Sequence, residues 1–230
     1  MVRKIMILSI ISFMLISTGN SFAQFGNLGG MLGKVASNAS GGAVSITDLG
    51  SSRDQAITDY WAATKELDLS LQKAGEAFGV KKEVLDKLAV AQGLNEGTIN
   101  NDDADKHRQI SKDAQAIIAQ KMNETSTLSV EDKKLLGESM IHLALGIQKD
   151  VVLVGTIQKL SSQAQAAMKS VSPMEIIKVK DIATTALTLG KEVPLDLGLE
   201  RDILGAYIKY AKANNVPVTS QIDSAAIPEK

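Results

Sequence analysis

The sequence has no cysteine, two histidines and few aromatic residues, which make up 3% of its 230 residues. Without cysteine, neither disulfide bonds nor thiolate metal sites can form, so stability must come from an ordinary hydrophobic core. His107 and His142 would need carboxylates or methionines to complete a metal site, and Met140 would point away from His142 on a helix. We therefore expect no metal and no other cofactor. A core poor in aromatic residues also favours closely packed helices over a β-sandwich.

A surplus of basic charge is also missing. The chain has 25 lysines and arginines against 26 aspartates and glutamates, a formal net charge of −1. The lysines lie scattered among acidic residues, so the sequence has no basic field that could neutralise nucleic-acid phosphates. We therefore expect no nucleic-acid partner.

Sequence motifs of catalysis are absent as well. The stretch GESM at 137–140 lacks the second glycine of a nucleophile elbow and lies within a helical pattern. The glycine-rich segment 26–33 lacks the lysine and serine that end a phosphate-binding loop. Asp102, Asp103 and Asp105 do not have the spacing of an EF-hand, and an acidic helix start explains them. We expect a protein that is not an enzyme, with no catalytic and no cofactor-binding residues.

Residues 1–23 have the three parts of a secretory signal peptide. Arg3 and Lys4 form a basic start, residues 5–16 form an apolar stretch, and the triplet SFA at 21–23 is a small-x-small cleavage site. The apolar stretch is shorter than the ~20 residues that span a bilayer. Cleavage would remove two of the 25 basic residues and leave a formal charge of −3. We expect the protein to be exported, either to the periplasm or out of the cell.

The next segment, residues 24–45, is rich in glycine and serine, and we expect it to be a flexible arm. It contains one apolar pattern with helical spacing, formed by Phe25, Leu28, Leu32 and Val35. These four residues would form an interaction stripe for a protein or a membrane surface if a partner made the segment helical. Each glycine costs about 1 kcal/mol in a helix relative to alanine, so only a partner could offset this cost.

Residues 46–215 carry the periodic apolar pattern of an all-α domain, whereas residues 216–230 show no periodicity and are expected to be loosely ordered. The most apolar stretch, 135–160, lies in a pattern that runs without proline over about residues 130–170. Ser129 and Asp132 resemble a capping box at its start. We predict a single elongated helical bundle around this long central helix.

Three glycines of the central helix, Gly137, Gly146 and Gly155, recur every nine residues. Nine residues correspond to about half a turn, so the glycines are expected to admit close neighbours on both sides of the helix. A bend near Gly155 is an alternative to a continuous helix. The charged interruption at 148–150 argues against a transmembrane span, and we expect His142 to find a hydrogen-bond partner at a helix interface.

The other helices are expected at residues 53–78, 81–92, 104–122 and 199–213. Gly79 is placed to end the first of them. Ser172 and Pro173 signal the start of a partly helical segment that reaches residue 190, with residues 176–179 either helical or extended. Pro194 is expected to separate this segment from the last helix.

The layout of a signal peptide, a mature start of the type QFGNLGG, a helical body and the motif SVSPM followed by VKD resembles exported bacterial α-helical proteins of uncharacterised function. This resemblance implies a location in the bacterial envelope or outside the cell, and it implies no activity. We therefore expect an interaction or scaffold module with a protein partner in the envelope. Two alternatives stay open: a membrane-active protein that inserts its central helix, and a carrier of an apolar ligand between its helices.

Overall fold

The structure is a computed structural model that describes residues 45–92 and 99–225. The predicted signal peptide and the predicted stripe of Phe25, Leu28, Leu32 and Val35 lie outside these residues. Every regular element within them is an α-helix, which confirms the predicted all-α class. The helices are α2 (Ile46–Ala77), α3 (Lys82–Gln92), α4 (Asn101–Glu124), α5 (Val130–Ala167), α6 (Ile176–Ala213) and α7 (Ser220–Ala225).

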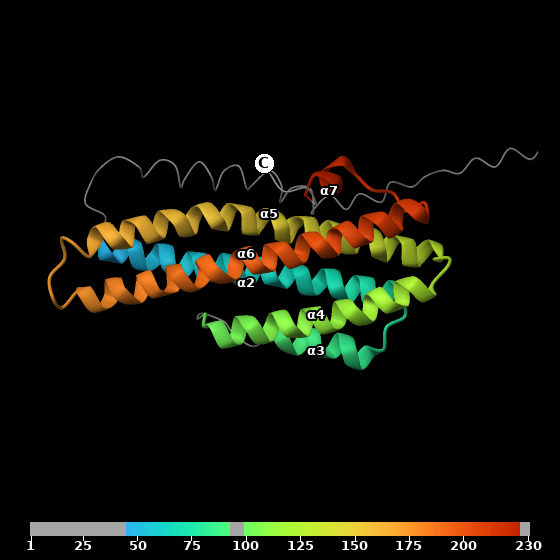
Figure 1. Cartoon of the computed structure of the whole chain (residues 1–230), viewed down its shortest axis with the longest axis horizontal. Helices are drawn as coiled ribbons and strands as arrows, with labels where there is room; N and C mark the ends of the chain where they lie inside the picture. The colour runs from blue at the N-terminus through green and yellow to red at the C-terminus, as the bar shows by residue number, and fades with distance from the viewer. Residues whose placement is uncertain (1–44, 93–98, 226–230) are drawn as a thin grey trace, which may run out of the picture. The chain divides into compact units, whose positions relative to one another are not determined.

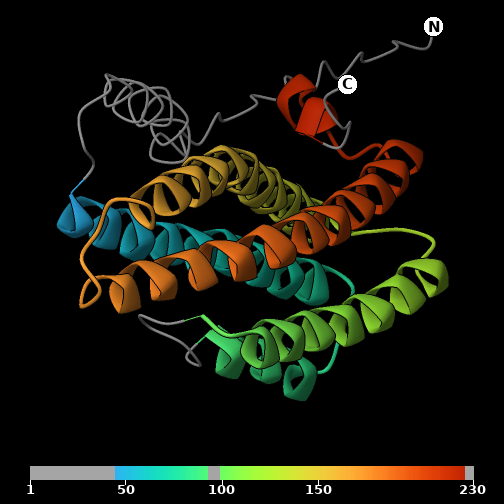
Figure 2. The same ribbon diagram turned by 60° about the vertical axis from the view of Figure 1, so that its left-hand side comes forward.

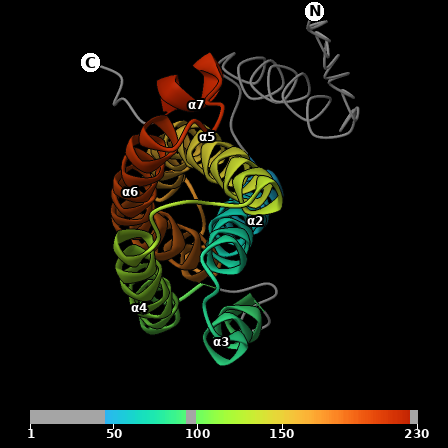
Figure 3. The same ribbon diagram turned by 90° about the vertical axis from the view of Figure 1, so that its right-hand side faces the viewer.

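The central element of the bundle is α5, a single helix of 38 residues. It packs along α2 on one side and along α6 on the other. The helix α4 contacts α2 and α6, and α3 contacts α2 and α4, so these two helices lie on the side away from α5 (Figures 1 and 2). Figure 3 looks along the helices and shows α2, α4, α5 and α6 grouped around one axis. The prediction of a bundle around a long central helix is confirmed.

The helix ends follow local signals in the sequence. Ser129 and Asp132 form the predicted capping box, in which Asp132 N donates to Ser129 Oγ at 3.1 Å and Ser129 N donates to Asp132 Oδ2 at 3.3 Å. Asn100 caps α4, whose first turn is acidic as expected. Gly79 follows the end of α2 with a φ of 64°, a left-handed conformation that glycine adopts without strain. These ends were predictable because their partners are three or four residues away.

The helix α6 differs from the prediction of a break at Pro194. It is continuous over 38 residues with Pro194 in its interior, and residues 176–179 are helical, not extended. Proline inside a helix costs about 3 kcal/mol, because its ring removes a backbone hydrogen bond and crowds the preceding turn. Pro194 is exposed, whereas Leu189 and Ile203 on either side of it are 0% and 2% exposed. Burial on both sides of the proline holds the helix together, so packing overrides the local signal.

The residues after α6 also differ from the expected loosely ordered tail, as far as the structure describes them. Val216 and Ile222 are each 4% exposed, and α7 packs against α5. Lys212 Nζ lies 2.8 Å from Asp223 Oδ1 and links α6 to α7. Two apolar residues six positions apart are too few to produce a helical period in a sequence. Their burial depends on contacts with distant residues.

The buried apolar side chains form two separate clusters. One includes Ile147 of α5 and Ile203 of α6. The other includes Leu153 of α5 and Val193 of α6. Both helices therefore leave one cluster and enter the next over a short distance, and the buried residues between these positions are polar.

Candidate functional site: a buried polar belt

Polar side chains fill the space between the two apolar clusters. Asp150 lies between the clusters in α5, and Asp196 and Glu200 lie between them in α6. We call the whole group the polar belt, and each of its members is at most 9% exposed: Tyr60, Glu66, Asp68, His107, Arg108, Asp150, Glu192, Asp196 and Glu200. Ionisable side chains are seldom buried unless they are paired, so the partners of each member decide what the belt does.

Arg108 in α4 is the main cation of the belt. Its Nε donates to Asp196 Oδ1 at 2.6 Å, and a terminal nitrogen donates to Glu192 Oε2. A second terminal nitrogen donates to Asp105 Oδ1 at 2.7 Å, nearer the surface. Burial alone would lower the pKa of Arg108, but its hydrogen bonds to Asp196 and Glu192 outweigh this effect and raise it. The planar guanidinium thus joins α4 to α6 through several charge-assisted hydrogen bonds.

Glu66 in α2 is the centre of a second ion-pair group. His142 Nδ1 and Lys149 Nζ, both from α5, lie 2.7 Å from the two oxygens of its carboxylate. Burial would raise the pKa of Glu66, but the hydrogen bonds with His142 and Lys149 outweigh it and lower the pKa. The prediction that His142 has a hydrogen-bond partner at a helix interface is confirmed.

His107 and Asp68 form a third pair, between α4 and α2. The distance from His107 Nε2 to Asp68 Oδ2 is 3.0 Å, and both residues are buried. Burial raises the pKa of Asp68, and the hydrogen bond with His107 opposes this rise. Asp68 Oδ1 has no hydrogen-bond partner in the part of the chain that the structure describes.

Glu200 lies directly against the backbone of α5. A Cβ atom added to Gly146 would be 2.7 Å from Glu200 Oε1 and 3.4 Å from the carbonyl oxygen of Ala63 in α2. Gly146 is therefore the position where three helices approach one another, as expected for a packing glycine. Gly137 and Gly155 do not share this role, because an added Cβ would have nothing within 4 Å at either position. The expectation that all three glycines admit close neighbours is wrong for these two.

The belt does not have the geometry of a metal centre. Among the described residues, no group of three or more histidine, aspartate and glutamate side chains could hold a metal ion. What the belt can do is hold charge and protons. Asp196 and Glu192 are ionic partners of Arg108, whereas Asp150 and Glu200 have no ion-pair partner in the described ranges, and each has one oxygen without a hydrogen bond.

Only part of this site could be predicted from the sequence. The charge at Asp150 and the interface position of His142 are among the predictions, whereas Asp196 and Glu200 are not. A signal was present, because Val193, Asp196, Glu200 and Ile203 continue the alternating spacing of three and four along the buried face of α6. Polar residues in an apolar seam indicate a buried polar network.

Comparisons of the chain with protein-family models, with curated proteins and with solved structures give no match.

Proposed function

We propose that this chain is an exported, non-catalytic helical protein that binds a protein partner in the bacterial envelope or outside the cell. The observation that carries the proposal is a row of large apolar side chains left exposed along α6 and just before it. Met174, Ile177 and Leu187 are 87%, 74% and 70% exposed, and Leu195 is 48% exposed. We call these four residues the α6 patch.

Helical geometry places the three members of the α6 patch that lie in α6 on one side of the helix. Ile177 and Leu195 are 18 residues apart, which is about five turns and about 27 Å of helix. Leu187 lies within about 80° of them on the helix circumference. Fully burying a side chain of this size contributes about 1.5–3 kcal/mol, so a partner that covered two or three of them would gain useful affinity.

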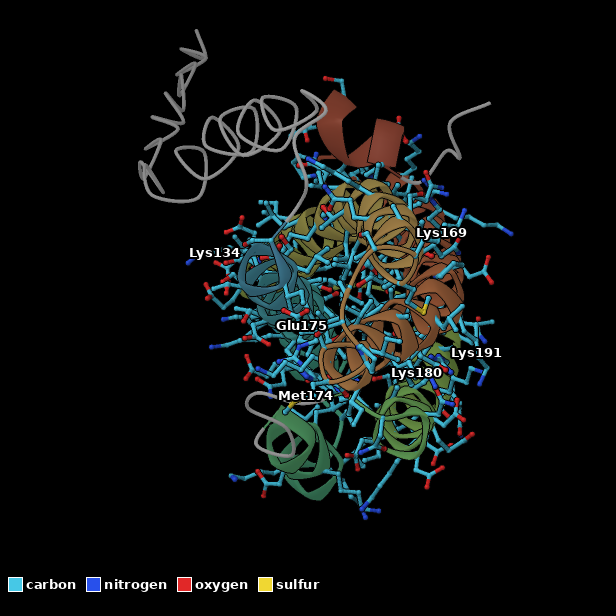
Figure 4. The ribbon with its side chains drawn as sticks, turned by 90° about the vertical axis from the view of Figure 1, so that its left-hand side faces the viewer. Lys134, Lys169, Met174, Glu175, Lys180 and Lys191 are labelled. Carbon is cyan, nitrogen blue, oxygen red and sulfur yellow. The ribbon has the colours of Figure 1, made fainter. Side chains whose placement is uncertain are left out.

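The charges around the α6 patch indicate the chemistry of the partner. Exposed lysines lie among its apolar residues, and Figure 4 labels two of them, Lys180 and Lys191, together with Met174. Asp181 on the same surface pairs with Arg53, and Lys191 Nζ lies 3.1 Å from Glu192 Oε1. At the end of the patch, the Ser172 hydroxyl donates a hydrogen bond to Glu175 at 2.6 Å. A protein surface with an apolar centre and an acidic rim would complement this arrangement.

The contacts within the polar belt support a structural role for its ionisable residues. Its cation Arg108 and its carboxylates Glu192 and Asp196 bind one another inside the bundle. These ion pairs hold α4 against α6. This structural role accounts for the buried charged residues without a catalytic function.

Insertion of α5 into a membrane is a second candidate function, favoured by one observation. Of the described helices, α5 is long and apolar enough to cross a membrane by length and composition. Half of its apolar window is buried in the bundle, as in the core helix of a folded domain. Insertion would also bring Asp150 into the hydrocarbon, which is costly without a partner. These facts favour docking through α6.

Site-specific photo-crosslinking in bacteria tests the proposed function. A photoreactive amino acid would replace Leu187 in the full-length chain, with the same replacement of Val130 in α5, 87% exposed, as the matched control. We expect an adduct with one protein from position 187 and none from position 130. The adduct should weaken several-fold when Lys180 is changed to glutamate.

Three outcomes would contradict the proposal. Equal adducts from positions 130 and 187 would show non-specific capture, and no adduct from either position 177 or 187 would show that the α6 patch has no protein partner. Flotation of the purified protein with phosphatidylglycerol vesicles, together with no protein adduct, would identify a membrane surface as the partner.

Cell fractionation of the same strain tests export, which requires the protein in the periplasm or the medium with Gln24 as its first residue.

A further inference from the structure

Two carboxyl groups of the polar belt remain without a cation of their own among the described residues. Asp150 in α5 and Glu200 in α6 are each 1% exposed. Asp150 Oδ1 and Glu200 Oε2 have no hydrogen-bond partner in the described part of the chain. Glu200 also faces the α5 backbone at Gly146, so the two carboxyl groups belong to the same seam between α5 and α6.

Two of the cations near this seam are bound to other carboxylates. Arg108 binds Asp196 and Glu192, and Lys149 binds Glu66. Arg201 favours the charged form of Glu200 from within α6, but this is the smallest of the influences on that carboxyl group. The charged and titratable groups around the seam are Tyr60 and Glu66 from α2, His107 and Arg108 from α4, His142 and Lys149 from α5, and Glu192, Asp196 and Arg201 from α6.

A buried carboxyl group in this position is more stable with a proton than with a charge. Transfer of an ionised carboxylate out of water is so unfavourable that the group becomes neutral unless a cation compensates it. Burial raises the pKa of Asp150 well above its ordinary value, and the charge of Asp196 adds to the rise. Burial also raises the pKa of Glu200 well above its ordinary value, followed by the charges of Asp150 and Asp196.

We propose that Asp150 and Glu200 form a proton-binding site between α5 and α6, and that release of its protons loosens the contact of these helices at Gly146. As neutral acids, the two groups fit an interior that already holds the negative charge of Asp196. As carboxylates, they repel this neighbour and each other, and separation of α5 from α6 relieves the repulsion. This site is distinct from the α6 patch and does not depend on the partner proposed above.

The direction of the pH effect follows from proton linkage. Groups whose pKa is higher in the folded state than in the unfolded state take up protons on folding. Their contribution to stability is complete below the unfolded pKa, which is about 4 for these side chains, and is lost as the pH rises through the folded pKa. The site therefore predicts that the bundle becomes less stable, and its α5–α6 seam more open, as the pH rises.

Urea unfolding of the mature protein from about pH 5 to about pH 9 tests the site. For the wild type we expect the unfolding constant to rise at least about tenfold over this interval. Asp150→Asn and Glu200→Gln remove the titrating groups with little change of shape, so each should reduce this rise, and the double variant should abolish it. Glu192→Gln is the matched control, because Glu192 is a buried carboxylate of the same helix that is paired with Arg108, and it should keep the rise. An equal rise in the wild type and the double variant would overturn the proposal.

Two measurements on the otherwise wild-type protein cover the case in which a variant fails to fold. Infrared spectroscopy at neutral pH should show a buried carboxylic-acid band that disappears at high pH, and its absence at neutral pH would overturn the proposal. Because the chain has no cysteine, spin labels can be attached through cysteines placed at Val151 in α5 and Leu195 in α6. The distance between the labels should increase and broaden at high pH, and an unchanged distance would refute the loosening of the seam.

Discussion

The hydroxyl of Tyr60 in α2 donates a hydrogen bond to Asp196 in α6, with 2.8 Å between the two oxygens. Arg108 from α4 binds the other oxygen of the same carboxylate, so three helices meet at one side chain. Burial raises the pKa of Tyr60, and the Asp196 carboxylate raises it further, which keeps the hydroxyl as a donor. The residues that bind Asp196 are therefore the natural targets for tests of the bundle.

Replacement of Arg108 by methionine should lower the free energy of unfolding by about 3–5 kcal/mol, because it leaves buried carboxylates without their cation. Arg108→Lys should recover only part of this loss, since an ammonium cannot donate in the fork geometry of a guanidinium. Urea unfolding followed by circular dichroism measures both effects. Arg53→Met is the matched control, because the partners of Arg53 are more than 60% exposed and such pairs contribute at most about 1 kcal/mol. A loss no larger for Arg108→Met than for Arg53→Met would contradict the assigned role.

Gly146→Leu should destabilise the bundle by about 1–3 kcal/mol through overpacking, because the new side chain would collide with Glu200 and approach the α2 backbone. Gly137→Ala and Gly155→Ala are the controls, since an added Cβ has open space at both positions. Alanine favours the helix over glycine, so each control should stabilise the protein by about 0.5–1 kcal/mol. The prediction fails if the three thermal unfolding midpoints change in the same direction.

Several helix ends could be predicted from the sequence because their determinants are local. The Ser129 capping box, the stop at Gly79 and the acidic start of α4 each involve residues a few positions apart. The polar belt could not be assembled in this way. Asp196 is a polar residue in the apolar pattern of α6, which marks it as unusual. Nothing in the sequence indicates that its partners are Tyr60 and Arg108, which are 136 and 88 positions away.

The same distinction explains the continuous α6. Pro194 is a strong local signal for a break, and its cost to a helix is about 3 kcal/mol. The residues that outweigh this cost, among them Leu189 and Val193, are buried against other helices. A local rule therefore predicted the wrong outcome at a position where tertiary packing opposes it.

Pro194→Ala should stabilise the protein by about 1–2 kcal/mol. Alanine restores a backbone donor and removes the crowding of the preceding turn, and the gain exceeds the roughly 0.4–1 kcal/mol that proline contributes by restricting the unfolded chain. Pro173→Ala is the control, because Pro173 lies in the turn before α6, where proline is well tolerated. The thermal unfolding midpoint should rise for Pro194→Ala and should fall or stay unchanged for Pro173→Ala. A lower midpoint for Pro194→Ala would show that the helix requires proline there.

Glu66→Gln should change how the free energy of unfolding depends on pH below neutral pH. Hydrogen bonds with His142 and Lys149 outweigh burial and lower the pKa of Glu66 in the folded state. A lowered folded pKa contributes stability above the unfolded value of about 4.3, and this contribution is lost as the pH falls through the folded pKa. The variant should lose about 1–3 kcal/mol at neutral pH and very little at strongly acidic pH, so its urea midpoint should fall less steeply on acidification than that of the wild type. This pH dependence is opposite in sign to that of Asp150 and Glu200. If the urea midpoints of the wild type and Glu66→Gln fell in parallel on acidification, the ion pair would contribute no net stability.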